Sequence, residues 1–142
     1  KELELPVQYW SKLQNGETVN YEGKEYNPEL VMGETRKGLK VTYCTDTRPV
    51  ENMITGGYQS DLFICEGMYG EPTEETNAKA YKHMTFQEAA TVAKESQSKE
   101  LWLTHFSPAL AFPKEYLHVA TKIFKNTKLG KDRKTKTLKF EE

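Results

Sequence analysis

Residues 39–44 read Leu39-Lys40-Val41-Thr42-Tyr43-Cys44, a nearly continuous apolar run that leads into a polar stretch from Thr45 to Arg48. Two later runs have the same character, Leu62-Phe63-Ile64-Cys65 and Leu101-Trp102-Leu103-Thr104. Apolar runs of this length are typical of central strands whose two faces are both covered. We therefore predict a strand at each of the three runs.

Helical patterns lie between and after these runs. Thr85 followed by Glu88 is a capping box, and apolar residues then repeat at helical spacing. Pro113 suits the first turn of another helix that carries one apolar stripe. A shorter helix is predicted over 49–54, ending at Gly56-Gly57. Strands that alternate with helices indicate the α/β class.

The two ends of the chain are predicted to differ from this pattern. We expect residues 1–38 to be a lead segment packed on the domain formed by residues 39–142. The lead segment should hold a short helix over 6–13 and a hairpin over 20–26 that turns at Glu22-Gly23. A terminal hairpin is predicted over 128–140, turning around Gly130-Lys131-Asp132.

Composition limits the classes of function. Of 142 residues, 37% are hydrophobic and 29% are charged, which favours a packed domain over a disordered chain. The net charge of −1 argues against binding nucleic acid through bulk positive charge. Two cysteines without a CxxC pair indicate neither a disulfide framework nor a zinc knuckle. No apolar run approaches the roughly 18–20 residues that span a bilayer, so we expect no membrane association and a cytoplasmic location. Because the chain starts at Lys1, we also expect it to be a fragment.

Basic residues are concentrated near the C-terminal end. Between 122 and 139 there are eight of them against one acidic residue, Asp132. One interpretation is a solvated sheet edge that lysines protect from aggregation. The other is a surface that contacts RNA phosphates. The eight are Lys122, Lys125, Lys128, Lys131, Arg133, Lys134, Lys136 and Lys139.

Polar side chains follow or end each predicted strand. Asp46 comes after the first, Cys65 and Glu66 end the second, and His105 follows the third. Since the carboxyl ends of such strands meet at one edge, this set predicts a metal or acid–base site. For each of these four residues, a purely structural role remains an open alternative to a role in such a site. Asp46 would cap the next helix, His105 would end its strand, Cys65 would be a small buried hydrophobe and Glu66 would pair with a lysine.

Several blocks resemble the ribonuclease Z family. Residues 43–49, Tyr-Cys-Thr-Asp-Thr-Arg-Pro, are similar to its (S/T/C)GDTRP block, and 101–107 to its LxLTHxS block. Residues 82–90 are similar to its His-Ser-Thr loop and the helix that follows. Residues 12–17 and 36–40 resemble the stretch before the Asp block. The blocks occur in the family's order and spacing over nearly all of the chain, which is therefore similar to the C-terminal half of such an enzyme.

The resemblance implies the C-terminal half of a metallo-β-lactamase αββα sandwich with two zinc ions at one edge. Asp46 would occupy the position that bridges both metals, and His105 that of the last histidine ligand. His83 matches the histidine of the His-Ser-Thr loop near the active edge, although it is equally interpreted as a polar residue before a helix cap. His118 is interpreted as structural. The implied activity is removal of 3′ trailers from precursor tRNA by a metal-activated water, in a homodimer.

Two departures from the family pattern shape these expectations. The HxHxDH motif is absent, so the remaining ligands are expected on a missing N-terminal half. The isolated chain is then expected to bind little zinc and to be inactive. Cys65 stands where the family has the histidine of His-Glu-Ala-Thr, and a buried thiol is a poor acid. The candidate catalytic residues are thus Glu66, Cys65 and His83. Two alternatives remain, another hydrolase or phosphodiesterase of the same fold and a non-catalytic RNA-binding fragment.

Overall fold

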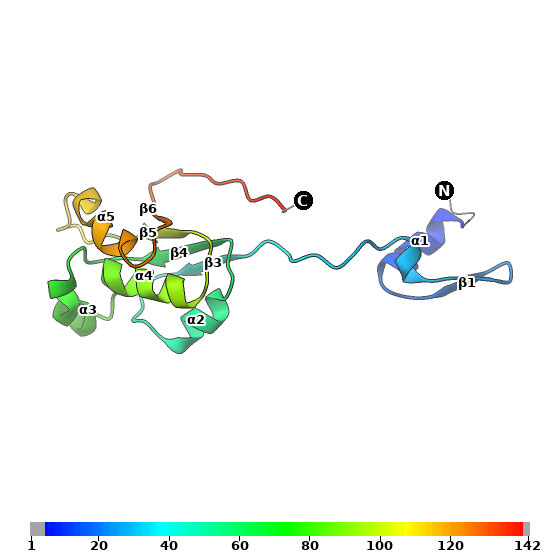
Figure 1. Cartoon of the computed structure of the whole chain (residues 1–142), viewed down its shortest axis with the longest axis horizontal. Coiled ribbons are helices and arrows are strands. Elements are labelled where there is room, and N and C mark those ends of the chain that lie inside the picture. Colours follow the sequence, from blue (N-terminus) through cyan, green and yellow to red (C-terminus); the bar gives the residue numbers. More distant parts are fainter. Residues whose placement is uncertain (1–4, 141–142) are drawn as a thin grey trace. The chain divides into compact units, whose positions relative to one another are not determined.

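The computed structural model describes residues 5–140 (Figure 1), and the chain divides into two compact units, Lys1–Lys37 and Gly38–Glu142. The first unit contains η1 (Val7–Tyr9), α1 (Trp10–Gln14), β1 (Val19–Tyr21), β2 (Lys24–Tyr26) and η2 (Pro28–Leu30). Its small core is formed by Leu5, Leu13, Val19 and Tyr26. Glu22 and Gly23 both have positive φ, 48° and 74°, as a tight two-residue hairpin turn requires. The predicted short helix and hairpin are confirmed.

The second unit is built on a four-stranded sheet in the order β3-β4-β5-β6, with every neighbouring pair parallel. Its strands are β3 (Val41–Cys44), β4 (Leu62–Glu66), β5 (Leu101–Thr104) and β6 (Thr127–Leu129). The helical elements are α2 (Glu51–Gly57), η3 (Pro72–Glu74), α3 (Glu75–Tyr81), α4 (Phe86–Glu95) and α5 (Pro113–Thr121). The three predicted strands and the α/β class are confirmed.

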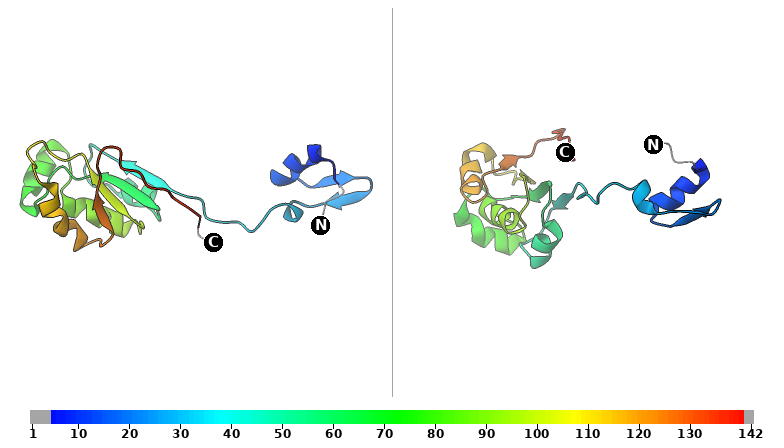
Figure 2. Two further views of the ribbon diagram at one scale, coloured as in Figure 1. Left: turned by 90° about the horizontal axis from the view of Figure 1, so that it is seen from above. Right: turned by 45° about the vertical axis from the view of Figure 1, so that its right-hand side comes forward.

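The main core lies between the sheet and its helices, on the face that α4 covers (Figure 2). Phe63 and Cys65 of β4, and Leu101 and Leu103 of β5, are fully buried there. Residues on the opposite face alternate with them along each strand. On that face of β3, Val41 and Tyr43 are 54% and 64% exposed. One face of this sheet is therefore only partly covered within the described residues.

Local signals set the ends of the helices. The Thr85 hydroxyl oxygen accepts a hydrogen bond from the Glu88 amide, and the Glu88 carboxylate accepts one from the Thr85 amide, so the capping box at the start of α4 is confirmed. Pro113 begins α5 as predicted. The helix expected over 49–54 is shifted and runs from Glu51 to Gly57. No helix in the described part of the chain is long and apolar enough to cross a membrane.

The predicted terminal hairpin is wrong. Residues 127–129 form β6, which pairs in parallel with β5, and no strand follows among the described residues up to 140. Gly130 continues the contact with β5 beyond the end of β6, because its amide donates to the Leu103 carbonyl at 2.7 Å. A Cβ at this position would lie 2.5 Å from Thr104 Cγ2 and 2.9 Å from that carbonyl oxygen. The glycine thus permits a close backbone contact with β5 rather than a reverse turn between two strands.

Candidate metal centre

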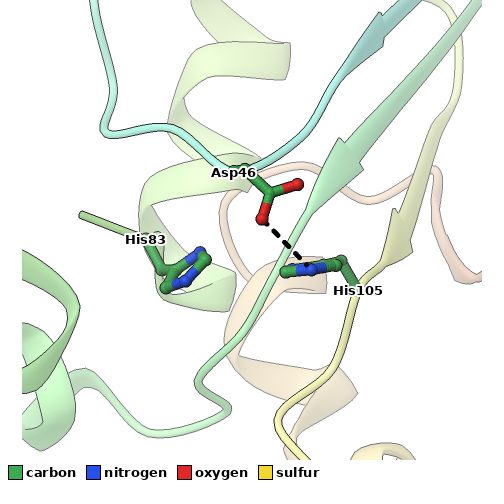
Figure 3. A group of neighbouring side chains, drawn as sticks. All are labelled: Asp46, His83 and His105. Carbon is green, nitrogen blue, oxygen red and sulfur yellow. Dashed lines mark ion pairs between the residues drawn. The ribbon is translucent and has the colours of Figure 1, made fainter. Parts of the chain in front are cut away.

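The carboxyl edge of the sheet brings Asp46 and His105 together (Figure 3). Asp46 follows β3 by two residues and His105 follows β5 directly. His105 Nε2 lies 3.4 Å from Asp46 Oδ1. Parallel strands deliver their carboxyl ends to one edge, and the predicted convergence of these two side chains is what the structure has.

His83 joins this pair from a different part of the chain. It lies in the short turn between α3 and α4, where Lys82 ends α3 with a left-handed φ of 63°. The His83 and His105 rings are 5.4 Å apart between centroids. Asp46, His83 and His105 each offer a ligand atom within 4.8 Å of the others. Carboxylate and imidazole groups are ligands that suit zinc, and an imidazole beside a metal can also carry a proton.

Asp46 and His105 both have a left-handed backbone, with φ of 52° and 56°. Residues other than glycine adopt this conformation at an energetic cost, although Asp, Asn and His tolerate it better than most. Such backbone strain is concentrated at functional sites, where the surrounding structure holds it in place. The two strand ends therefore direct their side chains toward each other through the conformation of the backbone itself.

Glu66 is the buried centre of this edge, with 0% of its side chain exposed. Its Oε1 accepts a hydrogen bond from the Thr47 amide at 2.5 Å, and its Oε2 accepts one from the Met84 amide at 3.1 Å. His83 Nδ1 lies 3.1 Å from the same Oε2. A carboxylate accepts hydrogen bonds, so the proton belongs on His83 Nδ1 and the lone pair on Nε2. The partners of Glu66 are thus two backbone amides and a histidine, and not the lysine that one interpretation expected.

Cys65 and His118 are not part of this cluster. Cys65 is fully buried in the core on the helix-covered face, since alternation along β4 directs it away from Glu66. Burial raises the pKa of its thiol well above the usual value, and the neighbouring Cys44 and Glu66 raise it further. His118 lies on α5 with Nδ1 2.7 Å from the Glu115 carbonyl oxygen. The structure therefore brings Asp46, Glu66, His83 and His105 together and leaves Cys65 apart.

No protein-family model matches the chain. Curated relatives named ribonuclease Z do match it. The one from Clostridium acetobutylicum is 55% identical over 141 residues, 99% of this chain and 46% of that protein. The one from Lachnospira eligens is 54% identical over 142 residues, 100% of this chain and 47% of that protein. The resemblance to ribonuclease Z is confirmed. The chain spans just under half the length of these ribonuclease Z relatives.

Solved structures give the same fold. A metallo-β-lactamase fold protein, YhfI from Bacillus subtilis, matches with a TM-score of 0.56 and 26% identity, over 64% of this chain and 36% of that one. The short form of human tRNase Z matches with a TM-score of 0.53 and 24% identity, over 76% of this chain and 34% of that one. The predicted fold class, half of a metallo-β-lactamase fold, is thereby confirmed.

Proposed function

We propose that this chain is the C-terminal part of a zinc-dependent endoribonuclease that removes 3′ trailers from precursor tRNA. The observation that carries the proposal is the cluster of Asp46, His83 and His105. This cluster lies in a chain of which 99% matches part of a ribonuclease Z. The same proposal includes further metal ligands outside this chain. It also includes a homodimeric enzyme in the cytoplasm. The further ligands would come from a second half, and the chain by itself would be inactive.

Asp46 and His105 would hold the metal. The Asp46 side chain is 62% exposed and the His105 side chain 37% exposed, so both are accessible to ions and to a second half. The two oxygens of one carboxylate are able to bridge two cations, and a neutral imidazole nitrogen suits zinc. When bound, two zinc ions would activate a water and stabilise the charge that develops on the phosphodiester.

His83 would handle the proton of the leaving group. Attack on phosphorus breaks its bond to the 3′ oxygen, which requires a proton as it leaves. His83 in its protonated form can donate that proton from Nε2, while Glu66 lies 3.1 Å from Nδ1 and orients the ring. The tRNA would then end in a 3′-hydroxyl, and the trailer would keep a 5′-phosphate. Cys65, buried on the other face of the sheet, would have no part in this step.

The first test combines this chain with the missing half and measures cleavage of precursor tRNA. We expect no cleavage by the chain alone and cleavage by the combined halves. Asp46→Asn should lower kcat by about 10²–10³, because several kcal/mol of metal stabilisation are lost. Asparagine tolerates the left-handed backbone, so the stability of the chain should stay within about 0.5 kcal/mol of the original.

Two results would contradict this proposal. Robust cleavage by the isolated chain would refute the half-enzyme, and a normal rate in Asp46→Asn would refute the metal assignment. Another hydrolase of the same fold would instead cleave bis-p-nitrophenyl phosphate efficiently and precursor tRNA poorly.

A non-catalytic RNA-binding role would require the basic residues of 122–139 to be available. Lys134 and Lys136 are engaged within the chain, since Lys134 donates to the Leu129 carbonyl and Lys136 to Glu100. Charge reversal at those two lysines would therefore disturb the fold as well. The exposed Lys122 and Lys125 are the better probes. The RNA-binding role would be favoured by RNA binding that is weakened by salt, needs no metal and is abolished by charge reversal at Lys122 and Lys125.

A further inference from the structure

Arg48 connects the loop after β3 to the turn that precedes α4. Its Nη1 donates to Glu88 Oε2 at 3.0 Å and to the His83 carbonyl oxygen at 2.5 Å. Its Nη2 pairs with the other carboxylate oxygen, Oε1 of Glu88. Only 24% and 18% of the two side chains are exposed. A two-pronged, largely desolvated pair of this kind is stronger and better defined than an ordinary surface ion pair.

Glu88 is itself held by the helix. Its Oε2 accepts a hydrogen bond from the Thr85 amide at 2.9 Å as part of the α4 capping box. Arg48 is thereby attached to the first turn of α4 and not to a freely rotating side chain. Its planar guanidinium makes these contacts through two nitrogens held in a fixed fork, whereas a lysine offers one nitrogen on a flexible stem.

The loop and the turn that Arg48 joins carry two groups of the candidate metal centre. Asp46 lies two residues before Arg48, and the His83 carbonyl is one of its acceptors. Glu66 forms a separate connection between the same two segments, through the amides of Thr47 and Met84. Two connections at different points prevent the loop from rotating about either one. The separation between Asp46 and His83 is thus fixed by two independent contacts.

We infer that Arg48 is a positioning residue that, through Glu88 and the His83 carbonyl, holds Asp46 and His83 at their working separation. This inference rests on the proposed function, which takes Asp46 and His83 as working groups. Arg48 acts on these groups only through the backbone and Glu88. Its loss should therefore alter the geometry of the metal centre more than the stability of the fold.

The first experiment measures that geometry by NMR in the metal-free chain. Cross-peaks in the nuclear Overhauser spectrum should connect the His83 and His105 rings, whose centroids are 5.4 Å apart. Arg48→Lys and Glu88→Gln should weaken these cross-peaks several-fold. Glutamine still serves in a capping box, so Glu88→Gln removes the ion pair and leaves the start of α4 intact.

Asp61→Asn is the matched control. It removes the ion pair between Lys99 and the largely buried Asp61 at the amino end of β4, and should leave the cross-peaks unchanged. Cross-peaks of original strength in both Arg48→Lys and Glu88→Gln would overturn the inference. Equal weakening in Asp61→Asn would also overturn it, because any lost ion pair would then have the same effect.

The second experiment titrates Co²⁺ into the same variants after each has been combined with the missing half, because the chain alone is expected to bind little metal. Loss of a residue that orients metal ligands typically lowers metal affinity by about 10- to 100-fold. We expect this fall in affinity in Arg48→Lys and in Glu88→Gln, and not in the control variant. Unchanged affinity in both would overturn the inference. Combined halves of the parent that bind no Co²⁺, while the parent chain keeps its cross-peaks, would count against the proposed metal centre. The positioning role would then be decided by the NMR result.

Discussion

Glu66 and Glu100 are both buried carboxylates on central strands of the sheet or next to them, but they lie at opposite ends of those strands. Glu66 ends β4 at the carboxyl edge, and its partners are the Thr47 amide, the Met84 amide and His83. Glu100 directly precedes β5 at the amino edge, and its partners are all side chains. They are the Trp102 indole at 2.5 Å, Lys136 at 2.6 Å and Lys128 at 3.1 Å.

The difference in partners gives the two carboxylates different roles. Backbone amides are fixed by the fold, so Glu66 sets the course of the main chain around the candidate metal centre. Lysine side chains are flexible, so Glu100 fastens the segment after β6 onto the sheet without defining its backbone. Lys134 supports the same attachment by lying over the Trp102 ring, 4.3 Å from its centroid. The same type of buried side chain thus builds a site at one edge and fastens a terminal segment at the other.

Glu66→Ala should have the larger effect on stability. It leaves the half-buried Thr47 amide and the buried Met84 amide without their acceptor, and we expect a loss of about 3 kcal/mol. Urea denaturation measures the change by fluorescence in a Trp10→Phe background, in which Trp102 is the remaining tryptophan. Glu95→Ala, an exposed change on α4, is the control and should lie within about 0.5 kcal/mol of the parent. A loss for Glu66→Ala no greater than the control's would show that the backbone partners of Glu66 contribute little.

Glu100→Gln should lower the free energy of unfolding somewhat less than Glu66→Ala does, and the size of this decrease should depend on pH. Burial acts to raise the Glu100 pKa, but hydrogen bonds from Lys136, Trp102 and Lys128 outweigh it and lower that pKa from 4.5 to about 2. A lowered folded-state pKa means that the stabilisation is complete above pH 4.5 and is lost as the pH falls toward 2. We expect Glu100→Gln to lower the free energy of unfolding by about 2 kcal/mol at pH 7, after allowance for the solvent exposure of Lys128.

The check is the free energy of unfolding of parent and Glu100→Gln across this acid range. The difference between them should be constant from pH 7 to about pH 5 and should shrink below that. A difference that stays constant down to pH 2 would show that the ionised form of Glu100 gains nothing from folding.

Cys65→Ala should have the smallest effect of the three, a loss of about 1 kcal/mol from a small core cavity. In the combined halves it should leave kcat for precursor tRNA unchanged, because Cys65 faces the core. Iodoacetamide should modify the partly exposed Cys44 well before the buried Cys65, although burial raises the pKa of Cys44 as well. A large fall in kcat for Cys65→Ala at normal stability would restore the thiol as a candidate acid or base.

Much of the fold was predictable because its signals are local. Apolar runs marked β3, β4 and β5, and the capping box marked α4. β6 was missed because its pairing with β5 is non-local, while Gly130-Lys131-Asp132 resembles an ordinary turn. α3 was missed because it is largely polar, and Ala78 is its one buried residue. Elements held mainly by distant contacts leave little trace in their own sequence.

The candidate metal centre was predictable only in part. Asp46 and His105 follow strands, so their convergence could be expected from topology. The position of His83 beside them depends on Glu66, and no local pattern distinguishes a buried carboxylate that binds backbone amides from one that pairs with a lysine. Arg48 and Glu88 belonged to recognised sequence blocks, but the contact between them spans 40 residues. Sequence spacing alone does not reveal such a contact.

The left-handed backbone at Asp46 and His105 has a consequence for assembly from two pieces. Because short-range torsions set the direction of both side chains, this part of the centre already has its shape before any partner docks. A complementing fragment would then meet a ready-made rim and would not have to reorganise it. This chain should accordingly add no slow rearrangement of its own to reconstitution, whose rate should be proportional to the concentration of each piece.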